Sequence, residues 1–285
     1  MIIFKDMNMM PVYELPFKAA FLIFIMFSMV GWISEVLYVG IFHEHKFVNR
    51  GFLYGPLCPV YGFGGVVILL LPPVLYETWI PLFLASMVLC TIVEYFVSWF
   101  MEKMFHARWW DYSHYKFNIK GRICLLNSVL FGFMGLGVIR FVYPQMLRFL
   151  NWLGDFVVMV SADTIGVILT IDIFFTVRKL VDFSSTMEKI KEFGESLRDH
   201  YGNETWFRSE SIEEMLASVK EHAAEGKDLI NQSILEKIDR IQNARHTAAE
   251  SFMAHFPTMK SIQYKDEFEH LKSRVKARVK AHLGK

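Results

Sequence analysis

Acidic side chains interrupt two long apolar stretches of this 285-residue sequence. Glu35 and Glu94 each lie past the middle of such a stretch, and Arg50 and Arg122 each stand just before the next one. An ionised carboxylate inside hydrocarbon costs roughly 2.5–3.5 kcal/mol, so it needs a partner or a function. A long arginine side chain could reach each glutamate. The pattern favours either a buried structural ion pair or a site that binds a substrate or couples protons.

The segment between two of the apolar stretches is unusually rich in aromatic and charged residues. It reads WWDYSHYKFNIKGR over residues 109–122. Its tryptophans and tyrosines are typical of an interfacial aromatic belt, but a belt does not require the acid, histidine, asparagine and arginine among them. We group these with the intramembrane residues as one candidate polar cluster. Its members are Glu35, Asn49, Arg50, Glu94, Asp111, His114, Asn118 and Arg122.

Motifs that would indicate catalysis or cofactor binding are missing from the sequence. There is no G-x-x-x-x-G-K-[ST] phosphate loop, which excludes ATP hydrolysis by that route, and no H-E-x-x-H, G-x-S-x-G or EF-hand loop. Four histidines could bind a metal with Asp111, but their spacing is no ligand signature. We therefore predict a protein that is not an enzyme and has no metal and no cofactor. The histidines in question are His43, His45, His106 and His114.

Composition separates the chain into a membrane part and a charged part. Hydrophobic residues make up 53% of the sequence and aromatic residues 16%, which is too apolar for an ordinary soluble domain. Residues 1–182 contain 13 Lys+Arg and 12 Asp+Glu, whereas residues 183–285 contain 17 of each. We predict a transmembrane domain over 1–182 and a charge-rich helical tail over 183–285. Three cysteines without C-x-x-C spacing are expected to be apolar packing residues: Cys58, Cys90 and Cys124.

The apolar stretches predict an all-α polytopic helix bundle. A helix needs about 20 mainly apolar residues to cross a bilayer. The second stretch is the least regular, because prolines crowd its start and end, and it could enter as a broken or re-entrant helix. The five predicted spans are about 17–42, 56–76, 79–101, 123–145 and 156–178.

Lysine and arginine residues predict the orientation. They concentrate in loops 43–55 and 102–122 and directly after the last span, so these regions are expected in the cytoplasm. The N-terminus then lies outside, and the polar cluster and the tail face the cytoplasm. Asp163 and Asp172 in the last span point to opposite faces, since nine residues are half a turn out of phase. Asp172 could join the cluster, whereas Asp163 points elsewhere.

The tail carries two helical signals. Ser211 and Glu214 have the spacing of a capping box, and apolar residues follow at helical period. The last segment predicts a basic amphipathic helix with Phe268 and Leu271 on its apolar face. Such a helix could lie on an anionic leaflet or dock on a partner. The alternative is a solvated helical hairpin that packs on itself.

The two glutamates begin similar patterns. Each is followed by Phe-His, then by Phe and Asn, then by a Gly/Arg pair and a glycine-rich span. We interpret this as a parallel repeat of two-helix units, with about ten extra residues, including WWDYSH, in the second unit. Few positions match, so coincidence is the alternative. The glycines indicate close helix packing or, alternatively, a cradle for a ligand.

Three blocks of the sequence resemble a known family. They are GWISEVLY (31–38), FVNRGFLYGPLCPVYGFG (47–64) and EYFVSWFMEKMFHARWWDYSHYKFNIKGRICL (94–125). They are similar to the bacterial ABC-transporter type IV, or CmpB-like, permeases. The resemblance covers about residues 20–180 and implies a multi-pass protein of the cell membrane, named as a permease subunit. It implies neither a substrate nor a catalytic role, and the tail lies outside it.

Three functions are compatible with these features. The first is a transport component in which the arginines hold an anionic or zwitterionic group and the glutamates position them or couple protons. Its partners would be the lipid bilayer and a separate ATPase subunit or another protein, with homo-oligomers also possible and no nucleic acid. The second is a membrane scaffold or sensor that recruits partners through its tail. The third is an intramembrane lipid-modifying enzyme that uses Asp111 and His114 as an acid/base pair.

Overall fold

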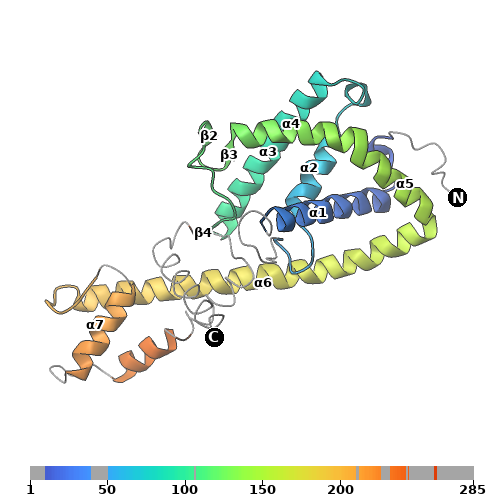
Figure 1. The fold of residues 1–285 in the computed structure, drawn as a ribbon. Coiled ribbons are helices and arrows are strands. Elements are labelled where there is room, and N and C mark those ends of the chain that lie inside the picture. The colour runs from blue at the N-terminus through green and yellow to red at the C-terminus, as the bar shows by residue number, and fades with distance from the viewer. Residues whose placement is uncertain are drawn as a thin grey trace, which may run out of the picture. The chain divides into compact units, whose positions relative to one another are not determined.

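A computed structural model of the chain describes residues 10–39, 51–105, 107–209, 212–225, 232–241, 243 and 260–261. This part is mainly helical, as predicted (Figure 1). Only two-residue strands accompany the helices: β1 (Ala107–Arg108) pairs with β4 (Lys260–Ser261), and β2 (Asn118–Ile119) with β3 (Ile123–Cys124). The helices are α1 (Phe17–Val39), α2 (Pro59–Leu69), α3 (Ile80–Phe105), α4 (Leu125–Gly137), α5 (Tyr143–Leu153), α6 (Asp155–Tyr201) and α7 (Ile212–Ala224).

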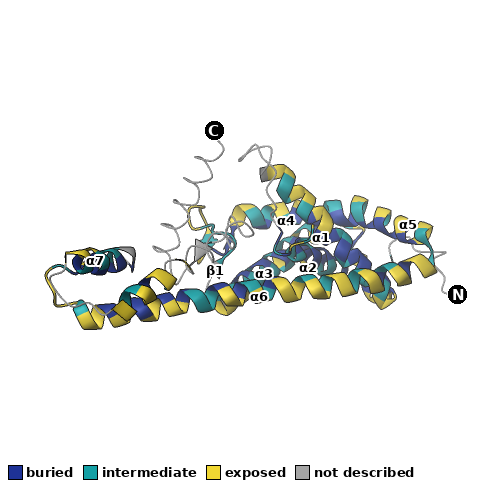
Figure 2. Cartoon of the chain, turned by 90° about the horizontal axis from the view of Figure 1, so that it is seen from below, coloured by how far each residue is buried: buried dark blue, intermediate teal, exposed yellow. Residues whose placement is uncertain are grey.

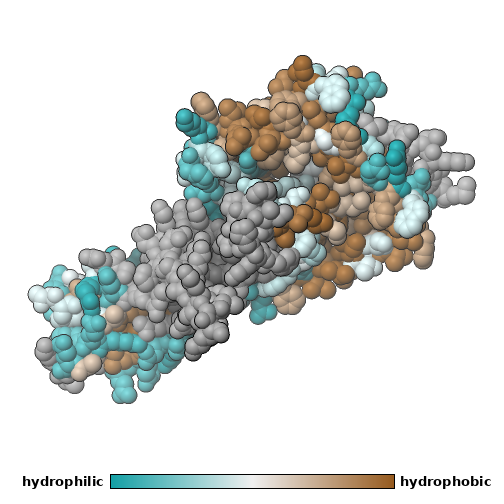
Figure 3. Space-filling view, viewed as in Figure 1, coloured by the Kyte–Doolittle hydropathy of each residue, from teal (hydrophilic) through white to brown (hydrophobic). Residues whose placement is uncertain are grey.

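The chain forms two compact units. One comprises Met1–Met101 and Trp110–Thr176, and we call it the membrane unit. The other comprises Glu102–Trp109 and Val177–Lys285, and we call it the tail unit. The chain passes between the units at the end of α3, again before Trp110, and finally inside α6 between Thr176 and Val177. In Figure 3, hydrophobic residues dominate the visible surface of the membrane unit, and the described surface of the tail unit is mostly hydrophilic.

Four helices of the described residues are long and apolar enough to cross a membrane. They are Phe17–Tyr38, Ile80–Met104, Leu125–Leu153 and Asp155–Tyr201. The third combines α4 and α5 through a π-helical turn at Val138–Val142, so it extends well past the predicted end at residue 145. Many apolar side chains on these helices are exposed, especially along α6 (Figure 2). Lipid tails are as apolar as leucine, so such a surface suits a bilayer.

The second predicted span, residues 56–76, differs from the helix that is observed there. Its helix, α2, has only 11 residues, or about 16 Å, against a hydrocarbon core of about 30 Å. A continuous helix over 56–76 is therefore wrong, and the broken form is observed. Proline is the reason: Pro59 occupies the first turn of α2, and Pro72 and Pro73 cannot continue a helix. The segment after α2 still runs back to the beginning of α1, because Tyr76 is buried in the same core as Val12 and Leu15, which precede α1.

Glycines allow the helices to approach one another. On α2, Gly65 lies against Phe27 of α1, and on α4, Gly132 lies against Phe83 of α3. A Cβ atom at either position would come within 2.5 Å of the phenylalanine ring. Gly62 and Gly135, three residues from these, contact Ser28 and Ser86 in the same way. The close-packing interpretation of the glycines is thus confirmed at these positions.

The tail unit has a small core of its own. Leu197 of α6 and Met215, Leu216 and Val219 of α7 are all buried. The ring of Trp206 stacks on His222 with 4.0 Å between the centroids. The helical prediction for this part is confirmed by α6 and α7. Ser211 and the basic segment around Phe268 and Leu271 lie outside the described residues.

Candidate functional site

The first glutamate is held by a tyrosine of the next helix. Glu35 lies in the second half of α1, and the Tyr61 hydroxyl of α2 donates a hydrogen bond to its Oε1 at 2.7 Å. Tyr61 reaches this position because it lies in the first turn of α2, which begins at Pro59. Its ring lies directly over Gly31, where a side chain would overlap it. The donor to Glu35 is therefore set by the start of α2 and by a glycine on α1.

The second glutamate is more deeply buried. Glu94 on α3 is 7% exposed, and its Oε1 accepts a hydrogen bond of 3.1 Å from the Tyr112 hydroxyl. Asn127 of α4 donates through Nδ2 to the same hydroxyl at 2.6 Å. The other carboxylate oxygen, Oε2, is buried and has no hydrogen-bond partner among the described residues. The carboxyl group is thus held on one oxygen and left open on the other.

Both glutamates influence the pKa of the same tyrosine, Tyr112. Burial raises the pKa of the Tyr112 phenol above its ordinary value, and the adjacent charge of Glu94 raises it further. Glu35 makes a smaller contribution in the same direction, so it lies within electrostatic range of Tyr112. Tyr112 therefore stays protonated at neutral pH and acts as a donor.

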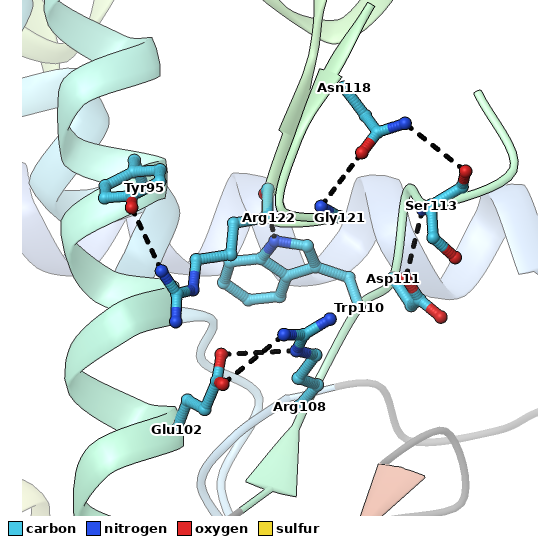
Figure 4. A network of polar contacts seen from close by, with 9 residues as sticks. All are labelled: Tyr95, Glu102, Arg108, Trp110, Asp111, Ser113, Asn118, Gly121 and Arg122. Atoms are coloured by element: carbon cyan, nitrogen blue, oxygen red, sulfur yellow. Dashed lines mark hydrogen bonds and ion pairs between the residues drawn. The ribbon is translucent and has the colours of Figure 1, made fainter. Parts of the chain in front are cut away.

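A compact hairpin over residues 109–122 brings Tyr112 to Glu94. Its backbone closes where the Tyr112 N–H donates to the Gly121 carbonyl at 2.8 Å. The indole Nε1 of Trp110 donates to the Arg122 carbonyl at 3.0 Å (Figure 4). Lys120 and Gly121 adopt positive φ angles of 53° and 69°, which turn the chain sharply between β2 and β3. The aromatic and polar residues of this segment thus build a support for a donor to an intramembrane carboxylate.

Two predicted cluster residues shape that hairpin. Asn118 accepts the Gly121 N–H at 3.0 Å through Oδ1 and donates to the Tyr115 carbonyl at 2.8 Å through Nδ2. Asp111 Oδ1 accepts the Ser113 N–H at 3.0 Å, an Asx turn (Figure 4). His114 is exposed, and its ring lies 4.4 Å from that of Tyr115. The hydrogen bonds of Asn118 and Asp111 are thus those of turn-forming residues.

The arginine of the hairpin has a different partner from the predicted one. Arg122 is only 9% exposed, and its Nη1 donates to the Tyr95 hydroxyl at 3.0 Å (Figure 4). The guanidinium carbon lies 5.3 Å from the centroid of the Tyr95 ring, a cation–π distance. Tyr95 follows Glu94 on α3 but lies about 100° around the helix. The expected ion pair between Arg122 and Glu94 is consequently not formed, and Asn49 and Arg50 lie outside the described residues.

The two aspartates of α6 have separate partners, as their half-turn spacing predicts. Asp172 accepts the backbone N–H groups of Tyr54 at 2.8 Å and Gly55 at 2.7 Å, and so fixes the segment that leads into α2. Asp163 forms a 2.7 Å ion pair with Lys18 at the start of α1. Asp172 therefore supports the polar cluster indirectly, through the loop before Tyr61.

Sequence reasoning missed the donors Tyr61, Tyr112 and Asn127. A signal for two of them exists: Cys58 and Cys124 precede the first residues of α2 and α4, and Tyr61 and Asn127 each follow three positions later. In the α1–α2 pair, the side chain at this position donates to Glu35 directly. In the α3–α4 pair, it donates to the Tyr112 hydroxyl, which in turn donates to Glu94. The common arrangement favours the repeat of two-helix units over coincidence.

Comparison with known proteins gives one match. A family model described as "Putative ABC-transporter type IV" matches residues 22–177, which is more than half of the chain. No curated protein and no solved structure matches significantly. The matched range contains both glutamates, the 109–122 hairpin and Asp172, and it ends one residue beyond the membrane unit.

Proposed function

We propose, given that the chain belongs to the family of putative ABC-transporters of type IV, that it is a membrane-spanning permease component. Membrane insertion follows from the four long apolar helices. The observation that supports a transport role is the buried carboxylate of Glu94 beside the Glu35–Tyr61 pair. Ionisable groups inside a membrane are costly and usually line a pathway for substrate or ions.

We orient the polar cluster toward the cytoplasm. The hairpin that covers Glu94 carries Lys116, Lys120 and Arg122 within a few residues, and cytoplasmic loops carry an excess of such residues. The N-terminus would then lie outside and the tail unit in the cytoplasm. In this arrangement the cluster opens to the side on which ATP is available.

The energy for transport would come from a separate ATPase subunit, because the sequence has no phosphate loop. The test is affinity purification of the full chain from bacterial membranes in mild detergent, followed by ATPase assay and mass spectrometry. We expect a stoichiometric partner with a phosphate loop. Glu94→Gln should keep that partner and abolish ATP-driven flux in reconstituted vesicles. A chain that purifies alone, or a Glu94→Gln variant with full flux, would contradict the proposal.

A scaffold is the second candidate, and the separate core of the tail unit favours it. Leu197, Leu216 and Val219 are buried within the tail unit itself, so this unit could present a defined surface to a partner. A scaffold should lose partner binding when Leu216→Asp disrupts that core, and should retain it in Glu94→Gln. The permease proposal expects Glu94→Gln to be the variant that loses function. We propose no catalytic role for Asp111, which accepts a backbone N–H in a turn.

A further inference from the structure

We propose that Glu94 is a proton-binding site inside the membrane unit, whose Oε2 takes up and releases one proton. This inference rests on the polar cluster being functional, as proposed above. It does not depend on an ATPase partner, so either proposal can fail alone. Uptake converts the carboxylate and one proton into a neutral carboxyl group, and release restores the negative charge.

The hydrogen bonding of Glu94 leads to this inference. An ionised carboxylate can accept hydrogen bonds at both oxygens. Oε1 has its donor in Tyr112, whereas Oε2 is buried without a partner among the described residues. A buried acceptor without a partner costs about 1–3 kcal/mol, and more when it is charged. A proton on Oε2 removes the charge, and it is the smallest ligand that can do so.

The groups around Glu94 leave the negative charge without a cationic partner. On α3 itself, Cys90 lies one turn away and its thiol donates to the Gly64 carbonyl. The hairpin contributes Tyr112, and α4 contributes Asn127, which is uncharged. Glu35 of α1 lies within electrostatic range of the same tyrosine.

The remaining neighbours do not supply a cationic partner for Glu94 either. Tyr61 of α2 donates to Glu35, and Arg122 is directed to Tyr95. Within the part of the chain that the structure describes, no lysine or arginine pairs with Glu94, and no group of three His, Cys, Asp or Glu side chains could hold a metal ion. The burial of Glu94, with only neutral donors among its described neighbours, favours its neutral form.

Glu35 provides an internal comparison. It is the same residue type, it also accepts a tyrosine hydroxyl on Oε1, and it lies in the corresponding position of the other helix pair. Glu35 is only half-buried, whereas Glu94 is 7% exposed. We therefore assign the exchangeable proton to Glu94, the more deeply buried of the two.

Carbodiimide labelling tests the assignment on the full chain. Dicyclohexylcarbodiimide adds to protonated carboxyl groups in apolar surroundings, and peptide mapping by mass spectrometry locates the adduct. The purified protein in detergent is labelled between about pH 5 and pH 9, roughly two units either side of neutrality. We expect an adduct at Glu94 that declines as the pH rises, and little adduct at Glu35.

Two variants complete the experiment. Glu94→Gln should lose the adduct, and Glu35→Gln should retain it at Glu94. Infrared spectroscopy of the unlabelled wild-type protein gives a second readout, a protonated-carboxyl C=O band that Glu94→Gln lacks. The proposal is overturned if Glu35 is labelled and Glu94 is not, if labelling of Glu94 does not change with pH, or if the wild-type protein shows no such band at the low-pH end. The wild-type readouts decide the matter even where a variant fails to fold.

Discussion

The ring of Tyr61 lies against the backbone of Gly31, so that any side chain at residue 31 would occupy the place of the ring. This contact between α1 and α2 lets the Tyr61 hydroxyl reach Glu35, 2.7 Å away. The position of a polar group in the cluster thus depends on a residue that has no polar side chain.

Replacement of this glycine should therefore be disruptive. We expect Gly31→Ala to lower the free energy of unfolding by about 1–3 kcal/mol, because the ring or the helix must shift. The measurement is thermal or denaturant unfolding in detergent. Gly137→Ala is the matched control, since nothing lies within 4 Å of a Cβ atom there. Equal stability of the two variants would show that α1 and α2 do not pack in this way.

Tyr112→Phe removes the donor to Glu94 and keeps the ring. Both the Glu94 carboxylate and the Asn127 amide then lose a partner, and we expect a loss of about 1–3 kcal/mol in unfolding free energy. The exposed Tyr115 of the same hairpin serves as the control. If Tyr115→Phe proves as destabilising as Tyr112→Phe, the hydroxyl of Tyr112 contributes nothing specific.

Asp172→Asn should loosen the segment before α2. One oxygen of Asp172 accepts from Tyr54 and the other from Gly55, and an asparagine offers a single oxygen. We expect faster hydrogen exchange at these two amides and a loss of about 1–3 kcal/mol. Asp163→Asn breaks the exposed ion pair with Lys18 and should cost about 0–1 kcal/mol. Unchanged exchange at Tyr54 and Gly55 would be incompatible with the observed hydrogen bonds.

Arg122→Lys tests whether the planar guanidinium is needed on Tyr95. A lysine carries the same charge but cannot reproduce both the hydrogen bond and the stacking over the ring. We expect a loss of about 1–2 kcal/mol in unfolding free energy. Arg148→Lys, at an exposed position of α5, should have almost no effect. If Arg122→Lys and Arg148→Lys changed the unfolding free energy equally, only the charge at residue 122 would matter.

The helical class and the membrane character could be predicted because they depend on the length of apolar runs alone. The extent of α2 could not be predicted with the same rule, because Pro59 is accepted in the first turn of a helix, whereas Pro72 and Pro73 cannot continue one. The composition still predicts a crossing there, since the apolar residues are present. Local backbone chemistry decided how much of this segment is helical.

The candidate site was predicted in part. The glutamates could be recognised from their cost in hydrocarbon, which any apolar stretch reveals. Their partners depend on which helix faces approach, and this is determined by contacts such as Gly65 with Phe27, which a single sequence does not display. Arginine was the expected partner because of its charge, yet the Tyr112 hydroxyl is the donor to Glu94, and Arg122 turns to Tyr95.

The shortness of α2 limits how the membrane unit can move. The backbone beside α2 is satisfied by other elements: Asp172 accepts from Gly55, Ser28 accepts from Cys58, and Tyr76 donates to Leu69. Lipid offers no replacement for these partners. A motion that pulled α2 away from α1 or from Asp172 would strand backbone groups in hydrocarbon. The bilayer thus favours keeping α1, α2 and the Asp172 turn of α6 together, and one hydrophobic core joins them to α3 and to the α4–α5 span.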